Sequence, residues 1–144
     1  MSTRRRILVV DDDERVLFVL QETLKTVGDD YEIVTGQNGH SALGRIKETA
    51  FDLIITDLRM PDLDGVELTE VIRALSPTTR VIWITAYDCR TLRADAVRLG
   101  VFRCLDKHLE IDEIRDAVRE ALGEVTNKPS ADPRVGGDSG EPSD

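Results

Sequence analysis

The chain has 144 residues, about the length of one domain, and its 40% apolar and 33% charged residues are ordinary for a globular protein. This composition excludes a collagen-like chain, a disulfide-rich scaffold and a wholly disordered protein. With 19 basic and 28 acidic side chains the formal net charge is -9, which repels nucleic acid and anionic membranes. A cation is therefore the more natural ligand.

The two cysteines, Cys89 and Cys104, lie in no CxxC or Cys/His metal spacing, and two thiols do not make a disulfide framework. We interpret Cys104 as a small buried apolar residue. The apolar run after the N-terminal arginines lasts only from Ile7 to Val10, too short for a signal peptide, and no run approaches the roughly 20 residues of a membrane span. We therefore expect a cytoplasmic protein in a reducing setting, neither exported nor embedded.

Short apolar runs alternate along the chain with segments of helical spacing. The runs predict strands at 7–10, 31–34, 53–56, 81–85 and 101–105. Apolar residues at helical spacing predict helices within 16–27, 42–46, 66–75, 92–99 and 111–122. The last helix is expected to be capped by Glu110 or Asp112 and to end at Gly123.

Strict alternation of strand and helix implies an α/β fold with parallel strands, right-handed crossovers and helices on both faces. This (βα)5 pattern predicts a doubly wound, five-stranded parallel sheet, and the order 2-1-3-4-5 makes it flavodoxin-like. Residues 1–123 form the domain. Residues 124–144 hold three of the five prolines and are interpreted as a disordered acidic Pro/Gly-rich tail or the start of a linker to an output domain.

Polar side chains stand where the predicted strands end. Asp11 and Asp12 follow the first strand, Asp57 the third, Thr85 ends the fourth, and Lys107 comes just after the fifth. Because the carboxyl ends of parallel strands meet at one edge of a sheet, these five residues are expected to form one site.

Three carboxylates meeting at one edge would repel each other unless a cation neutralised them. Mg²⁺ suits such a site, because it prefers one or two carboxylates, a carbonyl and waters. We expect Asp12 and Asp57 as direct ligands, Asp11 as a ligand through water, and the backbone carbonyl of Arg59 as the last protein ligand. Room would remain for a phosphoryl oxygen.

Phosphoryl transfer needs positive charge and hydrogen-bond donors around three oxygens more than it needs covalent chemistry. Lys107 and the Thr85 hydroxyl would supply them beside Mg²⁺. Asp57, at the middle of the predicted edge, is the carboxylate placed to act as the nucleophile. The expected product is an aspartyl phosphate.

The ordered set of motifs resembles the receiver domain of two-component response regulators. The segments that carry the resemblance are Ile7 to Asp12, Asp57 to Gly65, Thr85 to Tyr87, and Lys107. The resemblance covers roughly residues 5 to 123, with every element in order.

The resemblance implies magnesium-dependent phosphorylation of Asp57 by a histidine kinase or phosphotransfer protein, slow autodephosphorylation, and a downstream output protein or output domain. It makes the chain a signalling phospho-acceptor rather than a conventional enzyme. Asp11 and Asp12 match the acidic metal pair, Thr85 the switch hydroxyl and Lys107 the phosphate-binding lysine. The partner surface would be residues 90–99 with the neighbouring fifth strand and helix.

Four positions bear on how such a switch would work. His108 stands where the family usually has a proline, and Cys104 stands where it commonly has a switch tyrosine or phenylalanine. These departures leave phosphorylation chemistry possible and put its conformational readout in question. By the same resemblance, Arg59 and Tyr87 occupy the places that control how water reaches the phosphoryl group, and their bulk predicts slow loss of phosphate.

Two alternatives stay open. The departures at Cys104 and His108 are compatible with a pseudo-receiver, a binding module that is never phosphorylated. A magnesium-dependent small-molecule phosphatase is the other alternative, although the chain lacks a cap domain and has Arg59 where a second acid would stand. Trp83 is expected in the core, and His40 and His108 are interpreted as surface or packing residues.

Overall fold

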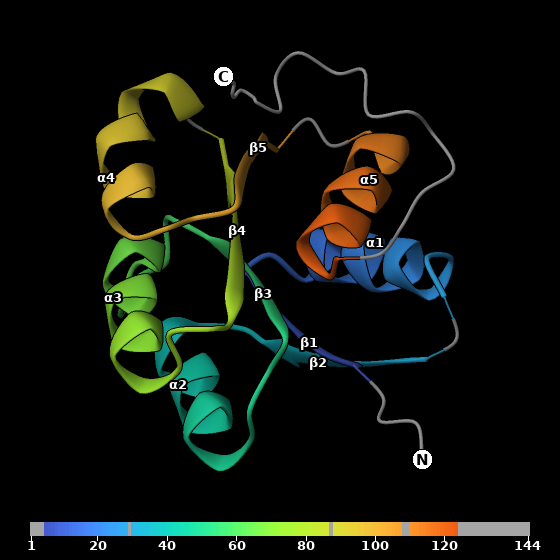
Figure 1. Cartoon of the computed structure of the whole chain (residues 1–144), viewed down its shortest axis with the longest axis horizontal. Coiled ribbons are helices and arrows are strands. Elements are labelled where there is room, and N and C mark those ends of the chain that lie inside the picture. Colours follow the sequence, from blue (N-terminus) through green and yellow to red (C-terminus); the bar gives the residue numbers. More distant parts are fainter. Residues whose placement is uncertain (1–4, 29, 87, 108–109, 124–144) are drawn as a thin grey trace.

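The computed structural model describes residues 5–28, 30–86, 88–107 and 110–123. A five-stranded parallel sheet forms its centre, with helices on both faces (Figure 1). The strand order is β2-β1-β3-β4-β5, so the doubly wound α/β fold predicted from the alternation of strands and helices is confirmed. Residues 124–144, interpreted above as a tail or linker, lie outside the described residues.

The strands are β1 (Arg5–Val10), β2 (Tyr31–Gly36), β3 (Leu53–Asp57), β4 (Arg80–Thr85) and β5 (Arg103–Asp106). The largest departure from the sequence prediction is at β5, which was expected to begin at Val101. The Val101 N–H instead donates to the Ala96 carbonyl at 2.9 Å. Val101 therefore closes the end of the preceding helix, and the strand begins two residues later.

The α-helices are α1 (Glu14–Lys25), α2 (Gly39–Glu48), α3 (Gly65–Leu75), α4 (Arg93–Arg98) and α5 (Ile111–Ala121). The segment predicted as one fourth helix, 92–99, is instead a 3-10 turn, η1 (Cys89–Leu92), followed by the six-residue α4. Asp88 caps η1 by accepting from the Arg90 N–H at 2.9 Å, whereas no side chain caps α4. The helical segment therefore starts earlier, and more tightly wound, than the apolar spacing indicates.

Side-chain and glycine caps fix the ends of the longer helices. Asp13 caps α1, and Asp64 forms a capping box with Glu67 at the start of α3. Of the two caps considered for α5, Glu110 occupies the N-cap position, without a side-chain bond. Gly123 follows α5 with φ of 73°, a conformation that favours glycine after a helix, as predicted.

Two apolar clusters, one on each face of the sheet, form the core. Helices α1 and α5 cover one face, and α2, α3 and α4 cover the other (Figure 1). Trp83 of β4 is fully buried in the second cluster, and its indole N–H donates to Thr69 Oγ1 at 2.9 Å. The prediction that Trp83 is a core residue is confirmed.

The parallel register brings the carboxyl ends of β1, β3, β4 and β5 to one edge of the sheet. Val10 pairs with Thr56 across β1 and β3, and Asp57 pairs with Ile84 across β3 and β4. This edge is where parallel α/β sheets hold their ligands. Among the described residues, no helix is long and apolar enough to cross a membrane.

Candidate functional site

The edge formed by the strand ends carries all five polar residues that the sequence singles out. Asp11 and Asp12 directly follow β1, Asp57 is the last residue of β3, Thr85 is the last residue of β4, and Lys107 directly follows β5. Asp11, Asp57 and Thr85 are buried, whereas Asp12 is exposed. The buried acids are thus at the bottom of the site and Asp12 is at its open side.

Lys107 joins two buried carboxylates. Its Nζ lies 3.0 Å from Asp57 Oδ2 and 3.2 Å from Asp11 Oδ2. Asp57 is 3% exposed and Asp11 is fully buried, so neither acid has much water to solvate its charge. The ammonium group is therefore the main compensation for two negative charges among the described residues around it.

Asp11 is the acid whose ionisation the fold disfavours. One of its oxygens, Oδ1, accepts from the Asp13 N–H at 2.9 Å, whereas the buried Oδ2 accepts no hydrogen bond of suitable geometry from the part of the chain that the structure describes. Burial, reinforced by the charge of Asp57, raises the pKa of Asp11 to about 6, although the Asp13 N–H and Lys107 act in the opposite direction. The Lys107 ammonium, 3.2 Å away, pairs with this oxygen as an ion without forming an aligned hydrogen bond, so the oxygen can also accept a further cation.

Lys107 stays charged because its two acids outweigh its burial. Desolvation lowers the pKa of this lysine. The hydrogen bond to Asp57 and the charges of Asp11 and Asp57 raise the pKa by a larger amount, so the net shift is upward. The Lys107 main chain is also fixed, because its N–H donates to the Thr85 carbonyl at 2.8 Å. The end of β4 therefore positions the backbone of Lys107.

The three acids fit a hard divalent cation. Asp11, Asp12 and Asp57 each offer a carboxylate oxygen, and these oxygens lie within 4.8 Å of one another. Hard oxygen ligands with an excess of negative charge are what Mg²⁺ prefers, and a cation would also serve the buried Asp11 oxygen that accepts no hydrogen bond. The donor set therefore agrees with the magnesium site expected from the sequence.

The segment after β3 places a main-chain N–H beside the Asp57 carboxylate. The Arg59 N–H donates to Asp57 Oδ1 at 3.3 Å, while the Arg59 side chain is exposed. Leu58 and Met60, on either side of Arg59, are buried and anchor this segment in the second apolar cluster. Position 59 is thus held next to the Asp57 carboxylate through its backbone.

Gly65 is a contributor to the site that sequence reasoning did not single out. It is the first residue of α3, and its N–H donates to the Leu58 carbonyl at 3.1 Å. A Cβ at this position would collide with the Asp57 carbonyl and with Leu58. The capping residues Asp64 and Glu67 on either side were the available signal, since they mark a helix that starts at this glycine.

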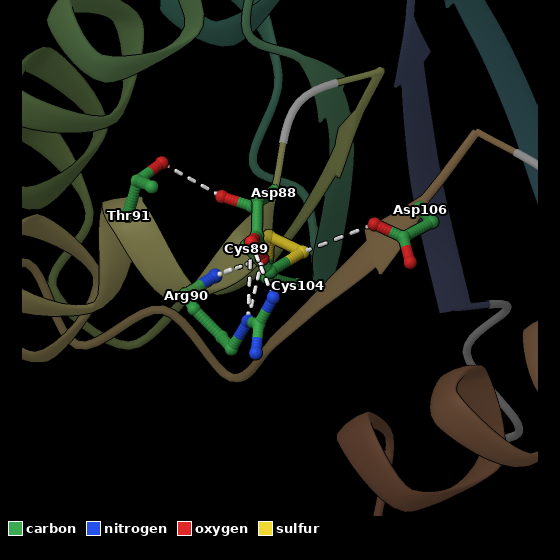
Figure 2. Close-up of a disulfide and its surroundings, with 6 residues drawn as sticks. All are labelled: Asp88, Cys89, Arg90, Thr91, Cys104 and Asp106. Atoms are coloured by element: carbon green, nitrogen blue, oxygen red, sulfur yellow. Dashed lines mark hydrogen bonds and ion pairs between the residues drawn. A yellow bond between two sulfur atoms is a disulfide. The ribbon is translucent and has the colours of Figure 1, made fainter.

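The structure corrects the interpretation of the cysteines. Cys104 is not a buried free thiol; it is half-buried and forms a disulfide with Cys89, whose Cα lies 6.0 Å from its own (Figure 2). Linear spacing hid this pair because η1 brings Cys89 back beside β5. Tyr87 and His108, the other two positions of interest, lie outside the described residues.

Residues 7–119 match the response regulator receiver domain family, which is more than half of the chain. The chain belongs to this family. The receiver domain has a five-stranded sheet in the order 2-1-3-4-5, and its solved relatives share this fold. One of these, a response regulator receiver domain protein from Clostridium thermocellum, has a TM-score of 0.75 at 26% identity and covers 83% of this chain and 94% of that chain.

Two kinds of relative match this chain: a longer regulatory protein, of which the matched region is one part, and a protein that the match covers almost entirely. The transcriptional regulatory protein ZraR of Salmonella typhimurium is 34% identical over 116 residues, which cover 81% of this chain but only 26% of ZraR. Sporulation initiation phosphotransferase F of Bacillus subtilis is 32% identical over 117 residues, covering 81% of this chain and 93% of that protein. The receiver domain therefore spans about a quarter of the first relative and nearly all of the second.

A liganded structure also matches. The response regulator TrrA from Thermotoga maritima, solved in complex with Mg²⁺ and BeF, has a TM-score of 0.73 and 34% identity, and covers 82% of this chain and 99% of that chain.

Proposed function

We propose that this receiver domain accepts a phosphoryl group on Asp57 from the phosphohistidine of a histidine kinase or phosphotransfer protein, in a magnesium-dependent reaction, and acts as a switch. The observation that carries the proposal is the contact of a buried Asp57 carboxylate with the Lys107 ammonium, inside a cluster of three acids. A carboxylate is a recognised covalent acceptor in phosphoryl transfer.

Each residue of the site has a separate role in this reaction. An oxygen of Asp57 attacks phosphorus, the bond from phosphorus to the donor nitrogen breaks, and the electron pair of that bond leaves with the imidazole. Lys107, 3.0 Å from Asp57 Oδ2, would pair with an oxygen of the transferred group. The Thr85 hydroxyl and the N–H of Arg59 are the proposed hydrogen-bond donors to the other oxygens of the transferred phosphoryl group.

The metal ligands proposed are Asp11, Asp12, Asp57 and the backbone carbonyl of Arg59. When bound, magnesium supplies positive charge to the acids and a coordination position for a phosphoryl oxygen. Asp12 and Asp57 are the proposed direct ligands, and Asp11 acts through a water. The burial of Asp11 and Asp57 strengthens their attraction for a cation, because little water screens their charge.

A phospho-acceptor of this kind differs from a conventional enzyme. We infer that the receiver domain catalyses its own phosphorylation and slow dephosphorylation and passes a change in shape to a partner. That partner is a downstream output protein, or an output domain joined through residues 124–144, as the larger size of ZraR suggests. The proposed contact surface is residues 90–99 together with β5 and α5, and the proposed location is the cytoplasm.

Phosphoryl uptake is the decisive measurement. The protein is mixed with acetyl phosphate and Mg²⁺, quenched in acid and weighed intact. We expect the wild type to gain the mass of one phosphoryl group, and Asp57→Asn to gain none. Asp30→Asn is the matched control, because Asp30 is an exposed acid just before β2, at the opposite edge of the sheet, and this variant should gain the same mass as the wild type.

Other results would favour the alternatives. No mass gain, with Trp83 fluorescence insensitive to Mg²⁺ and to beryllofluoride, would indicate a pseudo-receiver that binds partners without phosphorylation. Steady turnover of phosphomonoesters with Asp57 as the nucleophile would indicate a small-molecule phosphatase. Equal mass gain in Asp57→Asn would exclude Asp57 as the acceptor.

A further inference from the structure

A disulfide crosses from the segment after β4 to the last strand. Cys89 opens η1 and Cys104, 15 positions later in the sequence, is the second residue of β5. Figure 2 shows the bond between η1 and β5, with Asp106 farther along the same strand. The covalent ring that it closes contains all of η1 and α4.

The enclosed segment has few other attachments at its start. Helix α4 has only six residues, no side-chain cap at its first turn and no buried residue, and its Val97 is 74% exposed. Its far end is held differently, because Arg73 of α3 donates to the Leu99 carbonyl at 2.6 Å. The disulfide is the covalent anchor at the beginning of this segment. Leu92 and Ala96 pack, partly buried, against the second apolar cluster, and the Arg73 contact holds the end of the segment.

The disulfide also connects two of the chain segments that supply the site. Cys89 follows Thr85 by four residues, and Cys104 precedes Lys107 by three. Cys104 pairs in register with Trp83, on the same face of the sheet as α3 and α4. Because the Lys107 N–H already donates to the Thr85 carbonyl at 2.8 Å, closing the disulfide makes this link between β4 and β5 covalent.

The surroundings of Cys89 and Cys104 are compatible with both the thiol and the disulfide form. Both cysteines are half-buried rather than fully enclosed, so a small thiol or disulfide can reach them. Asp106 Oδ1 lies 3.9 Å from Cys89 Sγ, where it would accept the S–H of Cys89 after reduction (Figure 2). In a reducing cytoplasm, a disulfide of this kind is transient or regulatory rather than structural.

We propose that Cys89 and Cys104 form a reversible thiol–disulfide site, which restrains η1 and α4 and sets how far they respond to phosphorylation of Asp57. The proposal rests on the proposed function. Oxidation proceeds by exchange with glutathione disulfide. One protein thiolate attacks it and releases one glutathione; the second protein thiolate then releases the other. The two protein thiols lose two protons and two electrons, and the glutathione disulfide becomes two thiols.

The test separates the redox site from its effect on the switch. The full chain is equilibrated at several ratios of reduced to oxidised glutathione, treated with an alkylating agent and weighed intact. Hydrogen exchange across residues 88–106 is then compared with and without Mg²⁺ and beryllofluoride, a mimic of the phosphoryl group, in each redox state. The variant with both Cys89→Ser and Cys104→Ser is the matched control, since it cannot form the bond.

We expect the oxidised protein to lose two hydrogens and to resist alkylation. Beryllofluoride should change exchange over residues 88–99 by about tenfold in the reduced protein, and by about threefold or less in the oxidised protein, because the closed ring limits local opening. The double serine variant should follow the reduced protein at every glutathione ratio. Cysteines that stay alkylatable at every ratio, or an equal response in both redox states, would overturn the proposal.

If the proposed phosphorylation of Asp57 were wrong, the same experiment would give a different result. In that case beryllofluoride changes exchange in neither redox state, and Asp57 gains no phosphoryl group from acetyl phosphate. The thiol–disulfide site is then judged in the unliganded protein, where oxidation should slow exchange over residues 88–99 by about tenfold. Unchanged exchange there would overturn the restraint itself.

Discussion

Lys107 Nζ lies 3.0 Å from Asp57 Oδ2, although the strands that lead to these two residues are not neighbours. Strand β4 lies between β3 and β5, so the lysine side chain reaches across the end of a whole strand. A long flexible side chain is needed for this reach, and a charged one is needed for the two buried acids beyond it.

Lys107→Met should destabilise the metal-free protein by about 1 to 3 kcal/mol at neutral pH, because Asp11 and Asp57 lose their compensating charge. Mg²⁺ should stabilise this variant more than the wild type, since the cation replaces the missing charge. Urea unfolding with and without Mg²⁺ measures both effects. Lys25→Met is the control: its exposed pair with Glu22 at 2.9 Å should change stability by less than about 0.5 kcal/mol. Equal losses in the two variants would contradict the prediction.

The raised pKa of Asp11 predicts a particular pH dependence. The carboxyl has an ordinary pKa of 3.8 in the unfolded chain and about 6 in the folded protein, mainly because it is buried. Between these values the folded state holds a proton that the unfolded state has released, so the free energy of unfolding falls as pH rises from about 4 to about 6. Without metal, the loss due to Asp11 should reach about 1 to 3 kcal/mol above that range.

Asp11→Asn isolates this effect. The decline of the free energy of unfolding between pH 4 and 6 should be smaller in the variant than in the wild type, in urea titrations without metal. Magnesium affinity should show the opposite trend in the wild type, rising with pH through about 6, because protons compete with the cation for Asp11. Identical pH profiles for the two proteins would show that Asp11 ionises normally.

The fold was predictable because its signals are local and repeated. Continuous apolar runs marked the strands, amphipathic spacing marked the helices, and alternation of the two implied a parallel sheet. The meeting of Asp11, Asp57 and Lys107 could also be expected, because parallel strands end at one edge. Their distances and burial could not, since these depend on packing between elements that are far apart in the sequence.

The segment around Cys89 shows where sequence reasoning was wrong. Leu92, Ala96 and Leu99 have helical spacing, but Asp88 starts a 3-10 turn before them and α4 ends at Arg98. The cysteine pair was missed because a disulfide depends on three-dimensional proximity, and neither its spacing nor its composition marks it. The roles of the site residues remain predictions for the experiments described.

Gly65→Ala should displace Asp57 from the side of α3. A Cβ at Gly65 would collide with the Asp57 carbonyl and with Leu58, so β3 or α3 must shift, at a cost of about 1 to 3 kcal/mol. Gly44→Ala in α2 is the matched control, because a Cβ there meets no atom within 4 Å and should stabilise the helix by about 0.5 to 1 kcal/mol. Thermal unfolding of the two variants should therefore change in opposite directions, and a shared direction would refute the steric argument.

The hydrogen bond from Trp83 to Thr69 should stabilise the folded protein. In the wild type the buried indole N–H lies 2.9 Å from its acceptor, Thr69 Oγ1. Thr69→Val removes this acceptor and should destabilise the protein by about 1 to 3 kcal/mol. Thr69→Ser keeps the hydroxyl and should lose clearly less. Urea unfolding followed by Trp83 fluorescence measures this difference, and equal losses would show that the hydroxyl contributes no more than the methyl group that serine lacks.

Arg59 and Tyr87 should slow the loss of phosphate from Asp57. Arg59→Ala and Tyr87→Ala are each expected to speed the decay of the phosphorylated form several-fold, about 2- to 10-fold, because a smaller side chain admits water more easily. The decay is followed by intact mass after acetyl phosphate is removed. An unchanged decay rate in both variants would remove the shielding role from these positions.

Both outer strands of the sheet are poor templates for additional strands. Strand β5 has four residues, with charged side chains at its ends, Arg103 and Asp106. On the opposite edge, Glu32 of β2 is exposed and pairs with Arg6 of β1 at 3.3 Å. Short or charged edges discourage pairing between sheets of different molecules. The protein should therefore resist edge-to-edge aggregation at high concentration, and reduction of the cysteines should not change this resistance.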